Sequence, residues 1–254
     1  MGRAMNNHHP GACRLFVEHE LGAGRRIELD RDQAHYLRHV LRLADGALIA
    51  AFDGRNGEWL ARLVGQGRRG TALDLVEQLR PQTPQGDLDL LFAPLKHARL
   101  DYMVQKAVEM GASRLAPVVT RHTQVARLNL DRMRANAIEA AEQCGILSLP
   151  VIAPPLPLLE AMAALPPDRA LIFCDEAAGQ EGPIAALEAL RRGPLAVLIG
   201  PEGGFADEER RALLGRPGTL RLSLGPRIMR ADTAAVAALA LVQACLGDWR
   251  QGRA

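Results

Sequence analysis

The chain has 254 residues, of which 48% are hydrophobic and 24% are charged, and its formal net charge is +2. This size and composition are typical of a globular protein with one large domain or two small ones, and so small a net charge does not by itself indicate a nucleic-acid partner. No apolar run approaches the ~20 residues that a membrane-spanning helix needs, so we expect no contact with a membrane.

The four cysteines, Cys13, Cys144, Cys174 and Cys245, lie too far apart for a paired metal motif. A disulfide framework is unusual in a chain of this length, so we expect reduced, mostly buried thiols and a cytoplasmic location. Residues 1–13 are polar, resemble neither a signal peptide nor an anchor, and are expected to form a loose tail.

Residues 14–80 are expected to form a small β-rich domain. Alternating apolar residues separated by turn residues predict strands at residues 15–17, 26–29, 47–52, 57–64 and 71–79. Asp30 is a suitable cap for a helix over residues 31–43, whose apolar positions follow helical spacing. Several short strands with one helix suggest a small barrel.

Basic side chains recur on that predicted helix at spacings of three and four residues, at His35, Arg38, His39 and Arg42. They form either a solvated face or a surface that contacts RNA phosphates, and the spacing does not separate the two. His35 and His39 also have the i, i+4 spacing of metal ligands. Because no partner ligand is evident nearby in the sequence, we expect no metal site.

Residues 81–86 contain two prolines and a glycine and are expected to be a linker. Over residues 87–250 the pattern changes to alternating strands and helices. The predicted strands are residues 87–92, 114–120, 150–153, 170–174, 195–200 and 219–224, and the predicted helices are residues 100–108, 130–144, 156–164, 183–191 and 206–214, before a final alanine-rich helix. Such alternation indicates an α/β domain, a parallel sheet with helices on both faces.

Two glycine-containing loops follow predicted strands of this domain, within residues 198–205 (Leu-Ile-Gly-Pro-Glu-Gly-Gly-Phe) and residues 224–234 (Leu-Gly-Pro-Arg-Ile-Met-Arg-Ala-Asp-Thr-Ala). Loops at the carboxyl ends of parallel strands are where small ligands usually bind. The spacing fits neither the Walker nor the dinucleotide motif, and Glu202 would repel a phosphate. The loops therefore favour a neutral or cationic ligand such as the sulfonium of S-adenosylmethionine, with plain tight turns as the alternative.

Together with residues 140–145 (Ala-Ala-Glu-Gln-Cys-Gly), the two loops resemble the bacterial 16S ribosomal RNA uridine-N3 methyltransferases of the SPOUT superfamily. Residues 105–111 are similar to that family's helix before its second strand. Residues 35–42 and 52–54 resemble its N-terminal PUA-like domain. The resemblance covers nearly the whole chain after the tail.

The resemblance implies an N-terminal PUA-like β-barrel at residues 14–80 and a C-terminal SPOUT methyltransferase domain at residues 87–250. In that family the α/β domain is tied in a trefoil knot, and two subunits pair across the knot as a homodimer. The implied cofactor is S-adenosyl-L-methionine, and the implied partner is 16S ribosomal RNA or the small ribosomal subunit.

The resemblance also implies site residues, carried over position by position. Those for the donor are Leu198, Ile199, Gly200, Pro201, Glu202, Gly203, Gly204, Leu224, Gly225, Ile228, Met229, Thr233 and Ala234. Those for RNA are Arg38, His39, Arg42, Arg121 and Arg227.

Methylation at uridine N3 requires the N3 proton to leave and the resulting anion to be stabilised. Arg230 is the first candidate for the stabilising cation, with Arg227 as the second. Glu202 or Asp232 could accept the proton or hold ligand hydroxyls, and the sequence does not separate these roles. No cysteine nucleophile is needed, because attack by N3 on the methyl group of the donor requires no covalent bond between the protein and the RNA.

The chain departs from the family at several positions. Ala231 and Asp232 stand where Thr and Glu are usual, Ile146 replaces an arginine, and Ala206 replaces a serine. The segment 120–124 (Thr-Arg-His-Thr-Gln) also differs. Alternatives are therefore a SPOUT methyltransferase on another RNA such as transfer RNA, a non-catalytic RNA-binding ribosome-assembly protein, or a metabolite-binding module.

Overall fold

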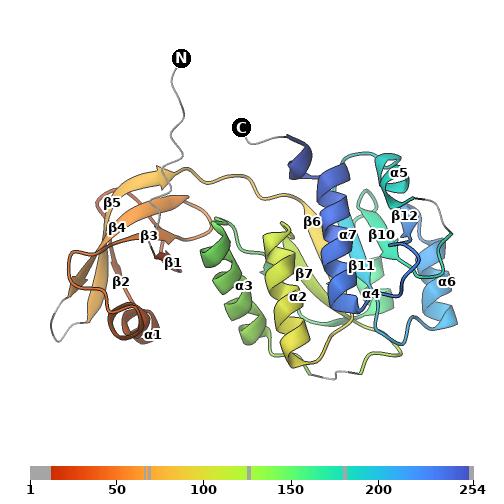
Figure 1. The fold of residues 1–254 in the computed structure, drawn as a ribbon, viewed down its shortest axis with the longest axis horizontal. Coiled ribbons are helices and arrows are strands. Elements are labelled where there is room, and N and C mark those ends of the chain that lie inside the picture. Colours follow the sequence, from red (N-terminus) through yellow and green to blue (C-terminus); the bar gives the residue numbers. More distant parts are fainter. Residues whose placement is uncertain (1–12, 66, 68–69, 125–126, 180–181, 252–254) are drawn as a thin grey trace, which may run out of the picture. The chain divides into compact units, whose positions relative to one another are not determined.

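The computed structural model describes residues 13–65, 67, 70–124, 127–179 and 182–251, and residues 1–12 of the expected tail lie outside this part. The chain divides into two compact units (Figure 1). The first unit contains the chain up to Pro84 together with residues 141–148. The second contains residues 85–140 and the chain from Leu149 onward.

The first unit is built on a five-stranded sheet. Its strands are β1 (Arg14–Phe16), β2 (Arg26–Glu28), β3 (Leu48–Phe52), β4 (Glu58–Gly65) and β5 (Thr71–Arg80), in the order β1-β3-β4-β5-β2. β1 pairs with β3 in parallel, and the other pairs are antiparallel. Buried apolar side chains from several strands form its core, among them Leu15, Ile27, Ile49, Leu63 and Leu73. The five strands expected from the sequence are thus confirmed.

The helix predicted over residues 31–43 is confirmed as far as Val40, but its second half is π-helical and it ends three residues early. α1 (Arg31–His35) begins at Asp30, whose carboxylate accepts the Gln33 N–H at 2.7 Å, and it then continues as a π-helical turn over Tyr36–Val40. The backbone of Arg42 has φ 55°, a left-handed conformation that ends the helix. Single π turns of this kind often mark functional segments.

Glu58 holds the first unit together through two arginines. Its carboxylate accepts hydrogen bonds from Arg14 at 2.6 Å and from Arg80 at 2.8 Å. Arg14 also donates to the carbonyl oxygens of Ala141, Glu142 and Ile146, and Arg80 donates to that of Gly145. These contacts explain why residues 141–148 belong to the first unit.

The second unit contains a parallel sheet. Its strands are β6 (Leu88–Phe92), β7 (Arg114–Val119), β8 (Val151–Ile152), β10 (Ala170–Cys174), β11 (Leu195–Ile199) and β12 (Thr219–Leu222), in the order β12-β10-β11-β6-β7-β8, and β9 (Leu156–Pro157) pairs with β7. Every pair is parallel. The predicted parallel sheet is confirmed.

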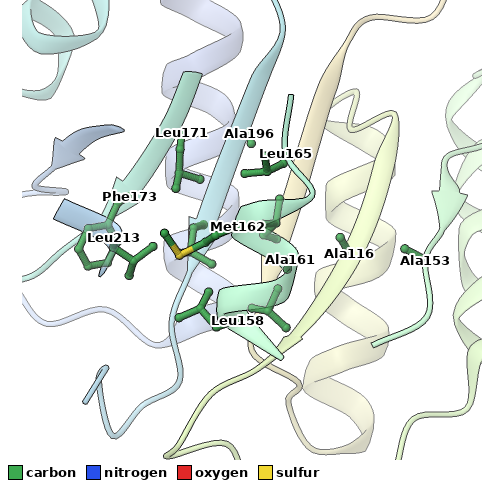
Figure 2. Packing of buried hydrophobic residues seen from close by; sticks show 13 residues of the cluster. Ala116, Ala153, Leu158, Ala161, Met162, Leu165, Leu171, Phe173, Ala196 and Leu213 are labelled. Atoms are coloured by element: carbon green, nitrogen blue, oxygen red, sulfur yellow. The ribbon is translucent and has the colours of Figure 1, made fainter. Parts of the chain in front are cut away.

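Helices cover both faces of this sheet. They are α2 (His97–Glu109), α3 (Leu130–Cys144), α4 (Leu158–Ala163), α5 (Pro183–Glu188), α6 (Asp207–Gly215) and α7 (Ala231–Cys245), followed by a 3-10 turn at Asp248–Gln251. α2 and α7 lie side by side, and Figure 2 shows α4 on the opposite face of the strands from them. Among the described residues, no helix combines the length and apolar character needed to cross a bilayer.

One core of the second unit lies between α4 and the strands (Figure 2). Leu158 and Met162 of α4 point toward Leu171 and Phe173 of β10, and Leu213 of α6 completes the cluster. Burial of such side chains stabilises the fold by about 1.5–3 kcal/mol each, as an upper estimate. Because this core holds β10 and β11 rigidly, it fixes the positions from which the two glycine loops leave the sheet.

Candidate functional site

A cavity of about 480 Å³ in the second unit lies where the two glycine loops meet. It is lined by residues that follow β10, β11 and β12 and by the start of α7. The predicted donor residues that line it are Ile199, Gly200, Pro201, Glu202, Gly203, Gly204, Leu224, Gly225, Ile228, Met229 and Ala234. Leu198 is instead buried in β11, and Thr233 is exposed on α7.

The first loop is shaped by its glycines. Gly204 has φ 69° and donates its N–H to the Pro201 carbonyl at 2.9 Å, a turn that disfavours a side chain. The Phe205 ring packs so tightly on Gly200 that a methyl group there would overlap it. Phe205 in turn makes an edge contact with Phe173, with ring centroids 5.2 Å apart. The loop is therefore tied to the core through one aromatic pair.

Two arginines at the larger cavity have side chains without a hydrogen-bond or ion-pair partner in the described part of the chain. They are Arg227 and Arg230, both on the second loop, and Arg230 immediately precedes α7. Arg210, which also lines the cavity, and Arg221 share the buried carboxylate of Asp175 at 2.7 and 3.0 Å. Among the described residues, Arg227 and Arg230 are thus the arginines of the lining whose side chains no carboxylate binds.

A third arginine, Arg99 of α2, joins the two loops. It donates two hydrogen bonds of 3.0 Å to the carboxylate of Asp232 and a third to Glu202. The hydrogen bond from Arg99 holds the pKa of Asp232 below its usual range. Sequence reasoning missed Arg99. The only available signal was that two carboxylates assigned to one site require a cation.

A smaller cavity of about 240 Å³ lies against the first loop. Its lining comes from Pro94, Leu95, Lys96, Arg99, His122, Gln124, Pro201, Glu202 and Gly203. His122 lies with its Nδ1 at 3.1 Å from the carbonyl oxygens of Gly203 and Gly204, a geometry in which Nδ1–H donates to them. Pro201, Glu202 and Gly203 border both cavities.

Burial and a neighbouring carboxylate make Cys174 unreactive. Its thiol lies at the larger cavity, and desolvation, with the charge of Asp175, raises its pKa to about 12. A thiol that stays protonated is a poor nucleophile. Nor do the described residues gather three side chains of the kinds that hold a metal ion.

The residues predicted to bind RNA fall on both units. In the first unit, Arg38 is occupied by Asp45 and by the Leu43 carbonyl, His39 stacks on His35, and Arg42 is exposed. In the second unit, Arg227 lines the larger cavity, as described above. Arg121 is also exposed there, with its backbone N–H bound to Glu209 at 2.8 Å. Within the described residues, the side chains of Arg42, Arg121 and Arg227 are exposed and have no protein partner, whereas Arg38 already has partners.

Two family models match the chain. One, described as an RNA methyltransferase domain, matches residues 81–243, and the other, an RNA methyltransferase PUA domain, matches residues 29–70. The first match alone covers more than half of the chain and includes every residue that lines the two cavities.

Curated relatives are similar in sequence to this chain over nearly its full length. The ribosomal RNA small subunit methyltransferase E of Rickettsia conorii is 30% identical, covering 91% of this chain and 94% of that protein. The protein of the same name from Synechocystis is 32% identical, covering 92% of this chain and 78% of its own.

Solved structures share the fold. A methyltransferase from Legionella pneumophila, in complex with bound S-adenosylmethionine, has a TM-score of 0.81 and 28% identity, covering 94% of this chain and 99% of that one. The ribosomal RNA small subunit methyltransferase E of Neisseria gonorrhoeae, bound to S-adenosylmethionine, also has a TM-score of 0.81, with 26% identity over 93% of this chain and 98% of that one.

Proposed function

The chain belongs to the RNA methyltransferase family, and from this premise we propose that it methylates N3 of a uridine in 16S ribosomal RNA with S-adenosyl-L-methionine as donor. The observation that carries the proposal is the pair of loops that form one cavity, with the free guanidinium of Arg230 at its wall. Full-length similarity to small-subunit ribosomal RNA methyltransferases supports the substrate class.

The larger cavity suits the donor in size and charge. Its volume of about 480 Å³ falls within the range of small-molecule sites, roughly 300–1,000 Å³. Glu202 at its wall disfavours a nucleotide phosphate and is compatible with a sulfonium or a ribose diol. The structural relatives that contain S-adenosylmethionine support the same assignment.

When bound, S-adenosylmethionine supplies a sulfonium methyl group, which passes to N3 by in-line displacement while the electron pair of the broken C–S bond stays on sulfur. Arg230 stabilises the uracil anion that N3 deprotonation creates, a contribution of about 3 kcal/mol for one well-placed donor. Holding both reactants in line lowers the barrier by roughly 7–11 kcal/mol more.

Of the two carboxylates, Glu202 is the better acceptor for the N3 proton. Asp232 is held by two hydrogen bonds from Arg99 and its pKa is lowered, so it stays ionised and fixes Arg99 in place. Glu202 borders both cavities and its side chain is 48% exposed, so it can pass the proton to water.

The departures from the family pattern leave these contacts intact. Asp232, although shorter than the usual glutamate, reaches Arg99 with both oxygens. Ala206 has no capping hydroxyl, but the Glu209 carboxylate accepts its N–H at 2.9 Å. Ile146 contributes its carbonyl oxygen to Arg14. The contacts of Asp232 and Ala206 are therefore compatible with an active enzyme.

The remaining family properties belong to the same proposal. These are the domain division into residues 14–80, 81–86 and 87–250, the trefoil knot, the homodimer and the cytoplasmic location. The exposed Arg42 and His39 of the first unit are the proposed RNA contacts there, and the PUA match over residues 29–70 supports them.

The direct test incubates the purified protein and S-adenosylmethionine with small subunits from a strain lacking the modification, followed by nucleoside analysis. We expect 3-methyluridine in 16S ribosomal RNA and none in an equal amount of transfer RNA. Methylation confined to transfer RNA would replace the proposed substrate. Calorimetry that detects no binding of S-adenosylmethionine would instead favour the non-catalytic assembly protein.

A further inference from the structure

We propose that the smaller cavity receives the target uracil base, and that Glu202, with Lys96 and Gln124 beside it, recognises the N3 edge of that base. The inference rests on the proposed function, because it places the acceptor of the same reaction. It adds roles for Lys96 and Gln124, neither of which was a site candidate from the sequence.

The smaller cavity adjoins the larger cavity, which is the proposed donor site. A methyl group passes directly between two reactants, so the acceptor must bind in a space that adjoins the donor. The two cavities share Pro201, Glu202 and Gly203, and thus a single loop lies beside both. The volume, about 240 Å³, is half that of the larger cavity, which suits a single base better than a second cofactor.

The polar side chains of the smaller cavity match the hydrogen-bonding pattern of uracil. The N3 edge of uracil presents one N–H donor between two carbonyl acceptors. Its complement is an acceptor flanked by donors, and the cavity offers the Glu202 carboxylate together with the Lys96 ammonium and the Gln124 amide. Pro94, Leu95 and Pro201 provide apolar walls of the kind that the faces of a base require.

The lining of the smaller cavity disfavours other ligands. A site for phosphate alone gains nothing from three apolar walls. Cytosine carries an acceptor at N3, which would face Glu202 without a hydrogen between them. A polar group left unpaired in a binding site discriminates against the wrong ligand. Arg99 donates a hydrogen bond to Glu202 and so holds its carboxylate in place.

The chain contains only two lysines, Lys96 at this cavity and Lys106 one turn before the end of α2, which makes a matched test possible. We expect Lys96→Met and Gln124→Ala each to lower kcat/KM for unmethylated small subunits about tenfold. Calorimetry should give an unchanged Kd for S-adenosylmethionine. Lys106→Met, which removes an ion pair with Glu109 outside both cavities, should leave both measurements unchanged.

A second measurement uses the unaltered protein. The two lysines are acetylated with and without small subunits, in the presence of S-adenosylhomocysteine, and the modified peptides are quantified by mass spectrometry. RNA should protect Lys96 several-fold more than Lys106. Equal protection, or full kcat/KM in both cavity variants, would overturn the assignment. A wild-type protein that makes no 3-methyluridine would refute the proposed function alone, since the protection of Lys96 still reports whether RNA enters the cavity.

Discussion

Arg99 and Asp232 lie 133 residues apart in the chain and are joined by two hydrogen bonds of 3.0 Å. The pairing is bidentate, the geometry that gives arginine its advantage over lysine at carboxylates. Because Arg99 also binds Glu202, one cation connects α2 with the first glycine loop and with the start of α7. This one side chain therefore links the two loops that form the larger cavity.

Arg99→Met should weaken the binding of S-adenosylmethionine about tenfold, because two carboxylates then repel each other across the loops. Arg99→Lys should recover only part of the affinity, since an ammonium cannot make the paired hydrogen bonds. Isothermal titration calorimetry measures both. The control is Arg132→Met, which removes a similar bidentate pair with Asp101 away from the cavities. Wild-type affinity in Arg99→Met would show that the ion pair does not shape the site.

The lowered pKa of Asp232 predicts a pH dependence of stability. A carboxylate whose pKa is depressed by folding stabilises the protein above its ordinary value near 4, and this contribution is lost as the pH falls through the lowered pKa. Asp232→Asn should therefore cost about 1 kcal/mol of unfolding free energy at pH 5–8, since Arg99 is partly exposed. Denaturant titrations should show the difference shrinking below pH 4, whereas the exposed Asp168→Asn should change little at any pH.

Arg230→Ala should lower the methyl-transfer rate about 10²–10³-fold with donor affinity retained, because the guanidinium acts on the charge that develops on the uracil. Single-turnover rates and calorimetric Kd values separate the two effects. Arg211→Ala provides the matched control, since Arg211 contacts only its own helix in the described structure. An equal loss of rate and affinity in Arg230→Ala would identify Arg230 as a structural residue.

Gly200→Ala should destabilise the second unit by about 1–3 kcal/mol and abolish tight donor binding, because the added methyl group displaces the Phe205 ring. Gly193→Ala has open space around its new methyl group and serves as the control. Urea unfolding and calorimetry on both variants test the prediction. Unchanged donor affinity in Gly200→Ala would mean that the Phe205 contact does not hold the loop.

Glu58→Gln should destabilise the first unit by about 2–4 kcal/mol, since Arg14 and Arg80 lose the charge that they share. Trp59 on β4 reports this unit when the other tryptophan, Trp249, is replaced by phenylalanine. Fluorescence-monitored unfolding measures the change, with the exposed Glu77→Gln as the neutral comparison. A loss no larger than in Glu77→Gln would exclude Glu58 as the anchor of the unit.

Regular elements were predictable because their periodicity is local. The strand Ala170–Cys174 and the helix Leu130–Cys144 begin and end where the pattern places them. The helix predicted over residues 31–43 ends early, at Val40, because Arg42 adopts a left-handed conformation, for which an apolar repeat carries no signal. The boundaries of whole domains, and the binding role of each site residue, stay predictions.

The arrangement of the site was less predictable, because it depends on contacts between distant segments. The two glycine loops could be assigned to one cavity, since parallel strands end at the same edge of a sheet. The sequence does not indicate that Arg99, Lys96 and His122 lie beside the first loop. Arg99 comes from α2, Lys96 immediately precedes that helix, and His122 comes from the segment after β7. Nothing in the spacing of single residues indicates which of many arginines will meet a given carboxylate.

Residues 141–148 have a consequence for how this protein can be recombined with others. The first unit is discontinuous in sequence, and its buried Glu58–Arg14 pair is completed by carbonyl oxygens that the chain contributes some sixty residues after the unit's main stretch ends. Transplanting residues 1–84 onto another methyltransferase would leave Arg14 and Arg80 facing foreign backbone. A functional chimera must exchange the two stretches together, and a screen for swapped RNA specificity should be designed around that pair of junctions.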